Sequence, residues 1–178
     1  MRGWAIRTLA AVSVALLLSP TALGQVSWRV FKHPAFGFSL SYPDGWEAAS
    51  EDGPIAFMVV GPAPAGVDGL RLSVNVTTER VAADLTVDRF ESLSESRMGL
   101  LFQGYTRLRT DRLTIGGHRA ILRYYTWKRN DGLEVYQMQL HVVASGRAYV
   151  VTGTTAARSA QLKSEADLLL RIVSTFRP

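Results

Sequence analysis

The chain has 178 residues, no cysteine and a formal net charge of +5. The lack of cysteine excludes disulfides, thiol catalysis, thiolate metal sites and a lipid attached through cysteine. The high pI suggests affinity for anionic surfaces, but the basic residues are dispersed along the chain, which favours ordinary solubility. We therefore expect no more than a weak contact with an anionic membrane surface.

The first 24 residues have the pattern of a secretory signal peptide. Arginines precede an apolar run at 9–18, and the segment ends in Ala22-Leu23-Gly24, with small residues at the positions that a signal peptidase reads. The run is shorter than the roughly 20 apolar residues that span a bilayer. We predict a signal peptide over 1–24 and one domain over 25–178, exported to the periplasm or the exterior, soluble and not lipid-anchored.

The stretch from Phe36 to Trp46 predicts a strand that ends in a tight turn. Aromatic and aliphatic side chains occupy alternate positions from Phe36 to Tyr42. Pro-Asp-Gly follows, a sequence typical of turns, and directs Trp46 back toward the strand. A strand over 26–33 is expected to pair with it antiparallel.

Two further strands are predicted before the middle of the chain. Residues 55–60 are almost all apolar, which is typical of a strand covered on both faces in the middle of a sheet. A loop rich in glycine and proline follows at 61–69. Leu70 to Thr77 then alternates apolar and polar side chains, which predicts one face on the core.

Residues 86–102 predict a helix. Thr86 can serve as the N-cap, Asp88 lies in the first turn, and Gly104 follows as a stop. An apolar stripe at helical spacing is expected to face the sheet; its members are Val87, Phe90, Ser94, Met98 and Leu101.

The second half of the chain predicts four long strands and a closing helix. The strands, 106–115, 119–129, 133–144 and 148–154, are separated by hairpin turns such as Asn130-Asp131-Gly132. A wide apolar stripe over 159–175 predicts an amphipathic helix that the sheet must cover. We expect an α+β fold, with an antiparallel sheet of about six to eight strands flanked by helices.

The sequence Phe-Gly-Phe-Ser-Leu-Ser-Tyr-Pro-Asp-Gly-Trp at 36–46 resembles the opening of PsbP-like domains. The mid-chain helix, the hairpin strands and a closing helix that ends in Thr175-Phe176-Arg177 are similar in outline. These domains comprise the photosystem II extrinsic protein, exported bacterial proteins and lipoproteins, and a related nuclear-import factor. The resemblance implies an α/β/α sandwich and a non-enzymatic interaction or assembly factor for an envelope or membrane-associated protein complex. The lipidated cysteine of related lipoproteins is replaced by Gln25.

No sequence motif of catalysis is present. H-E-x-x-H, G-x-S-x-G, Walker and dinucleotide-binding glycine patterns do not occur. The histidines, His33, His118 and His141, fall in a turn, a hairpin corner and the polar face of a strand. We expect no enzyme, no cofactor and no specific metal site. An approach of His33 to His141 across the sheet, joined by carboxylates, would favour a metal or catalytic site instead.

Arg123, Tyr125, Trp127 and Arg129 alternate on one face of a strand and are candidate partner-binding residues. Arginine, tyrosine and tryptophan dominate the binding hot spots of protein interfaces. The pattern also suits single-stranded nucleic acid, which an exported protein rarely meets, so we expect a protein partner and no nucleic acid. The alternative is that a helix covers Tyr125 and Trp127 with the arginine stems over them.

Tyr42 and Trp46 are candidates for the lip of a ligand cleft, or else pack at the end of their strand. The alternative function is a carrier for a small apolar or anionic ligand held between the sheet and the 86–102 helix. A cavity of several hundred Å³ with an apolar lining would favour the carrier. An exposed patch of Tyr125, Trp127 and Arg129 would favour the protein partner.

Overall fold

The computed structural model describes residues 27–49 and 55–178, so the predicted signal peptide lies outside the described residues. The elements are β1 (Trp28–Lys32), β2 (Ser39–Pro43), β3 (Glu47–Ala49), β4 (Ile55–Val60), β5 (Ser73–Arg80), α1 (Val87–Leu101), β6 (Thr106–Ile115), β7 (His118–Lys128), β8 (Glu134–Ala144), β9 (Arg147–Ala156) and α2 (Leu162–Ser174).

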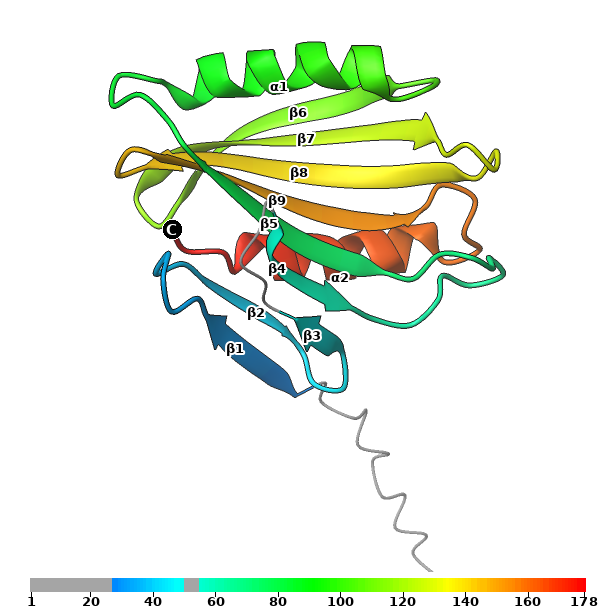
Figure 1. Ribbon diagram of the computed structural model, residues 1–178. Coiled ribbons are helices and arrows are strands. Elements are labelled where there is room, and N and C mark those ends of the chain that lie inside the picture. The colour runs from blue at the N-terminus through cyan, green and yellow to red at the C-terminus, as the bar shows by residue number, and fades with distance from the viewer. Residues whose placement is uncertain (1–26, 50–54) are drawn as a thin grey trace, which may run out of the picture.

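Seven strands form one antiparallel sheet in the order β3-β4-β5-β9-β8-β7-β6, and β1 and β2 form a separate antiparallel pair. Helix α1 packs on β7 and β8, whereas α2 packs on β9, β5 and β2 (Figure 1). The two helices lie on opposite faces of the main sheet. The predicted α+β sandwich and the predicted pairing of the first two strands are confirmed.

Several predicted boundaries are corrected. Strand β2 begins at Ser39 because Gly37, with φ 74°, belongs to the preceding turn. The helix expected from Ser159 begins at Leu162, because the Ser159 hydroxyl donates to the Glu165 carboxylate and accepts from the Gln161 amide within a turn. Strand β5 runs over 73–80 rather than 70–77. Strand β3 was not predicted, since its three exposed residues show no alternation.

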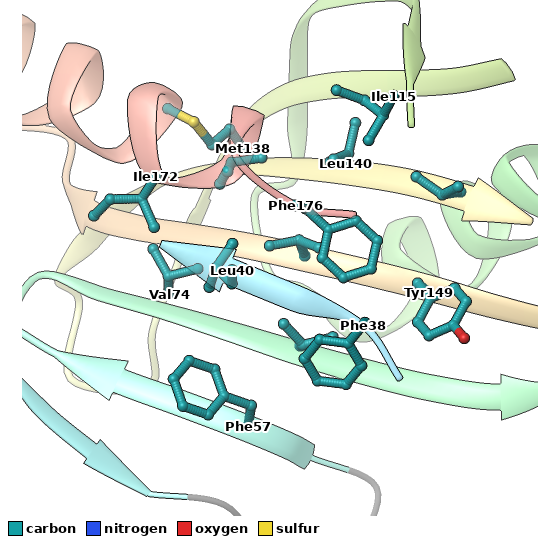
Figure 2. Close-up of a cluster of buried hydrophobic side chains, with 14 of the residues drawn as sticks. Phe38, Leu40, Phe57, Val74, Ile115, Met138, Leu140, Tyr149, Ile172 and Phe176 are labelled. Carbon is teal, nitrogen blue, oxygen red and sulfur yellow. The ribbon is translucent and has the colours of Figure 1, made fainter. Parts of the chain in front are cut away.

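The apolar core lies between the main sheet, β2 and α2 (Figure 2). Phe38 and Leu40 of β2 are fully buried, as the alternation over 36–42 predicts. They meet Ile172 of α2 and Phe176, which follows that helix and is also fully buried. The first strands and the last helix of the described chain are therefore joined in one core.

Over residues 27–49 and 55–178, no helix combines the length and the apolar character that crossing a membrane requires.

Candidate functional site

An N-cap sets the start of helix α1, and ion pairs with β6 connect the helix to the sheet. The Thr86 hydroxyl accepts a hydrogen bond from the Arg89 amide at 3.2 Å, which confirms Thr86 as the N-cap. Arg107 pairs with Glu95 at 2.8 Å, and Arg112 approaches Asp88 at 3.3 Å. These exposed pairs orient the helix more than they stabilise it, because solvent screens them.

The contact beneath α1 is polar rather than apolar. Arg123 of β7 has no exposed surface, and its guanidinium donates to the Glu91 carboxylate of α1 at 2.9 Å. A second nitrogen donates to the side-chain oxygen of Gln139 on β8 at 2.9 Å. A buried ion pair is tolerated when its remaining donors and acceptors are also satisfied, and Gln139 contributes one such bond here.

His141 extends this polar layer. Its ring is fully buried on the same face of β8, with Nε2 3.4 Å from the Ser94 hydroxyl of α1. Burial, together with the positive charge of Arg123, lowers the pKa of His141 to about 3, so the imidazole is neutral at ordinary pH.

His33 lies in the turn between β1 and β2, where it stacks on Phe36 and accepts backbone hydrogen bonds. It is therefore in the layer of the β1–β2 pair, whereas His141 faces α1, and the two histidines do not converge. Among the described residues, no group of three or more His, Asp or Glu side chains is arranged as metal ligands would be.

The predicted partner-binding residues lie mostly under cover. Arg123 and Tyr125 have no exposed surface, so their prediction as a contact surface is corrected. Tyr125 donates to Gln137 at 2.8 Å, and Trp127 stacks on Phe102 with ring centroids 4.4 Å apart. The sequence also allowed the alternative that a helix covers this face of the strand. Trp127 is only partly buried, and a partner-binding role for it stays a prediction.

Arg129 lies beyond the end of β7 and keeps one third of its side chain exposed. Its guanidinium donates to the Gly69 carbonyl and to the Asp131 carboxylate, each at 2.8 Å. These contacts join the β7–β8 turn to the loop before β5. A partner-binding role for Arg129 also stays a prediction.

Tyr42 and Trp46 make packing contacts. Tyr42 is 8% exposed and belongs to the core, with its ring centroid 5.9 Å from that of Phe57. Trp46 lies against Gly61, where a Cβ atom would overlap the indole ring. A ligand-binding role for these two residues stays a prediction.

A cleft of about 330 Å³ opens where α1 leaves the sheet uncovered. We call it the α1 cleft; it is lined by Thr77 and Glu79 of β5, Gln139 and Val150 of the sheet, and Phe90, Leu93, Ser94 and Arg97 of α1. It lies where the carrier alternative places its ligand, but its lining is mixed rather than apolar. The polar face of β5 was visible in the sequence, whereas its position beside α1 was not.

Helix α1 carries three exposed leucines. Leu93, Leu100 and Leu101 have 40%, 87% and 77% of their surface exposed. Leu101 was predicted to face the sheet, and this is corrected: α1 ends there, and the capping residue Phe102 turns inward onto Trp127. We call Leu93, Leu100 and Leu101 the α1 leucines; Leu93 also borders the α1 cleft.

Solved structures of low sequence identity share this fold. Cyanobacterial PsbP from Synechocystis sp. PCC 6803 matches with a TM-score of 0.65 and 14% identity over 90% of this chain and 98% of that chain. LpqN of Mycobacterium tuberculosis, described as involved in cell envelope biogenesis, matches with a TM-score of 0.61 and 14% identity over 86% and 92%. The Saccharomyces cerevisiae Ran-binding protein Mog1p matches with a TM-score of 0.59 and 11% identity over 86% and 96%.

The predicted PsbP-like fold is thus confirmed. No curated protein matches the chain significantly. The model of one protein family, described as the serine/threonine kinase C-terminal domain, matches residues 30–178. Because this match covers most of the sequence, the chain belongs to the serine/threonine kinase C-terminal domain family.

Proposed function

We propose that the chain is a non-enzymatic, exported binding module that acts as an interaction or assembly factor for an envelope or membrane-associated protein complex. Its contact surface is the exposed part of α1 formed by the α1 leucines and Arg97, together with the adjoining α1 cleft.

The observation that carries this proposal is the exposure of the α1 leucines. Leu100 and Leu101 are 87% and 77% exposed on a helix that has a polar layer beneath it. Exposed apolar groups that cluster, rather than occur singly, mark interaction sites. Leu93 lies two turns before Leu100, so these two leucines share one side of the helix, and Leu101 adjoins Leu100 at the last residue of α1.

Arg97 lies one turn beyond Leu93 on that side and is exposed. Leucine and arginine on one helix face present an apolar centre with a charged group beside it. This is the pattern of protein interfaces, in which arginine is enriched relative to the remaining surface.

The similar proteins support a binding role. LpqN is described as involved in cell envelope biogenesis, and Mog1p as a Ran-binding protein. The family is described as the C-terminal domain of a serine/threonine kinase. This sequence nevertheless contains none of the G-x-G-x-x-G, H-R-D and D-F-G motifs of kinase catalysis. A role in contacting other molecules, rather than in phosphoryl transfer, fits the sequence better.

The test compares partners captured by the tagged chain from the envelope of its own organism. Leu100→Glu with Leu101→Glu places charges in the contact surface and is expected to abolish capture of a specific protein. Val30→Glu is the matched control, because Val30 is 73% exposed on β1, outside α1. Capture that survives the double substitution but is lost in the control would overturn the placement on α1.

The alternative is a carrier in the α1 cleft. The cleft volume of about 330 Å³ is at the lower end of ligand sites, and this observation favours the carrier. The fluorescent probe anilinonaphthalene sulfonate is both apolar and anionic, so a carrier should bind it saturably in the folded state. Loss of that binding in Gln139→Leu or Leu93→Glu would support the carrier. Absence of saturable binding would leave the protein partner as the function.

A further inference from the structure

A second cleft lies on the opposite face of the main sheet. Helix α2 packs over β9 and β5, and the outer strands β7 and β6 extend past it. The space between α2 and β6 has a volume of about 330 Å³, within the range of small-molecule sites. We call it the α2 cleft; its principal lining residues are Leu108, Arg109, Tyr124, Tyr136, Asp167 and Leu170.

A β-bulge shapes the rim of the α2 cleft. The register of β6 on β7 shifts between Arg107 and Arg109. Neighbouring residues of a regular strand point to opposite faces, yet Leu108 and Arg109 both border this cleft. Bulges re-aim side chains in this way beside functional sites. The bulge therefore brings the side chain of Leu108, which is 53% exposed, to the rim of the cleft beside Arg109.

Two tyrosines lie in the α2 cleft with their hydroxyl groups available. Tyr124 and Tyr136 come from neighbouring strands and are each partly buried. Burial raises the pKa of both phenols, so each keeps its proton at ordinary pH. Neither hydroxyl forms a hydrogen bond with another residue of the described chain. Each is thus free to donate to and accept from a ligand.

The charges around the α2 cleft are already balanced by the protein. Arg109 forms two hydrogen-bonded contacts of 2.7 Å with Asp111 while its guanidinium lies 5.6 Å from the ring centre of Tyr124. Asp167 pairs with Lys163 at 2.6 Å. The Asp167 carboxylate would repel an anion in the cleft, and Arg109 would repel a cation. The balance favours a ligand without net charge.

We propose that the α2 cleft binds a neutral saccharide. A sugar ring has C–H faces that pack on aromatic and aliphatic side chains, and hydroxyl groups that both donate and accept hydrogen bonds. The rings of Tyr124 and Tyr136 match the first property, and their hydroxyls, with Asp167, match the second. A purely apolar ligand would leave these polar groups unpaired, which disfavours it. This inference goes beyond the proposed function, whose surface is on the other face of the sheet.

The test is an NMR titration of the folded chain with maltotriose, cellotriose and the N-acetylglucosamine trimer. Saturable shifts are expected for at least one of them, confined to the amides of Leu108–Asp111, Tyr136 and Asp167. Tyr124→Ala is expected to weaken binding about fivefold, because ring stacking of this kind contributes on the order of 1 kcal/mol. Tyr136→Phe keeps the ring, removes one hydroxyl and should weaken binding several-fold.

Tyr105→Phe is the matched control, because Tyr105 bonds to Glu95 of α1 on the other face and should leave saccharide affinity unchanged. If Tyr124→Ala fails to fold, Tyr136→Phe and Asp167→Asn at the rim carry the test. No saturable shifts with any trisaccharide, or shifts located elsewhere, would overturn the proposal. Tighter binding of phosphate or choline at these amides would overturn the ligand class.

Discussion

Arg123 shows how much the stability of one element depends on a single charge. It is the largest fully buried side chain of the described residues, and its ionic partner Glu91 is on a different element. Removing one member of a buried ion pair leaves the other without compensation, whereas removing both leaves an apolar contact. The loss of either Arg123 or Glu91 alone should therefore cost more stability than the loss of both.

We predict that Glu91→Leu lowers the free energy of unfolding by about 3–5 kcal/mol, because the Arg123 charge is left buried without its carboxylate. The double variant Arg123→Met, Glu91→Leu should recover a large part of this loss. Urea unfolding at neutral pH measures both. A loss below about 1 kcal/mol in Glu91→Leu would show that solvent or Gln139 compensates the guanidinium.

His141 makes the stability of the fold depend on pH. Its pKa is lowered to about 3, while an unfolded chain protonates histidine near 6.5. Between these values the unfolded state binds more protons, so stability is full above pH 6.5 and falls as the pH decreases. The slope approaches about 1.4 kcal/mol per pH unit for one such group.

We predict that the free energy of unfolding of the wild type falls by about 1.6 kcal/mol more than that of His141→Gln between pH 6.5 and pH 5. Denaturant unfolding at several pH values gives the two slopes. Parallel profiles for wild type and His141→Gln would contradict the buried neutral state.

At the scale of elements, the two helices attach to the sheet in different ways. Beneath α1 lie Arg123, Gln139 and His141, whereas α2 contacts the apolar core through Leu169, Ile172 and Val173. Glu165 adds one polar anchor to α2: burial raises its pKa, but hydrogen bonds from Ser159, Thr155 and the Ala65 amide outweigh this and lower it. Close packing thus matters most for α2.

Gly153 of β9 sets the distance between α2 and the sheet. A Cβ atom there would lie 3.1 Å from Cγ of Met138 and 3.3 Å from Cβ of Leu169. We predict that Gly153→Val lowers the free energy of unfolding by about 1–3 kcal/mol through overpacking, and that Gly153→Ala lowers it less. Thermal unfolding of the variants measures the effect.

Gly99 of α1 provides the matched comparison for Gly153, because a Cβ atom there would meet nothing within 4 Å. Gly99→Ala should raise stability by about 0.5–1 kcal/mol, as expected for alanine in a helix interior. Opposite signs at the two positions would confirm that contact with α2, rather than backbone freedom, decides the result. A stabilising Gly153→Ala would contradict it.

At the scale of the whole molecule, the sequence predicted those strands and turns that neighbouring residues alone specify. Asn130-Asp131-Gly132 and the alternation on both sides specify a hairpin without reference to distant residues, and β7 and β8 lie within one residue of their predicted ends. The same alternation does not predict which face of β7 a helix covers. The partner of Arg123 is 32 residues away in sequence, so tertiary packing alone determines it.

The candidate sites were less predictable for the same reason. The α1 cleft combines Thr77, Leu93 and Val150 from three separate elements. The α2 cleft depends on a bulge at Leu108 that no sequence pattern predicts. Leu101 fits the helical period of the stripe that faces the sheet, yet it is exposed because the helix ends at that residue. Local patterns specify elements, whereas clefts arise where elements leave each other uncovered.

The two ends of the described chain stabilise each other. The backbone of Ser39 on β2 pairs with that of Arg177 at 2.8 and 2.9 Å, and Phe176 packs against Phe38 and Tyr149 with ring centroids 5.7 and 5.5 Å apart. The β1–β2 pair is not part of the main sheet, so this contact is one of its principal attachments. Two strands alone are marginally stable in water.

We predict that Phe176→Ala lowers the free energy of unfolding by about 3–5 kcal/mol, as for other fully buried phenylalanines. Hydrogen exchange should accelerate in β2 before it does in β8, because β2 loses its packing partner while β8 keeps both neighbouring strands. Arg177→Ala is the control, since the backbone pair with Ser39 does not need the arginine side chain. Uniform acceleration over both strands would instead show that the β1–β2 pair and the main sheet unfold as one cooperative unit.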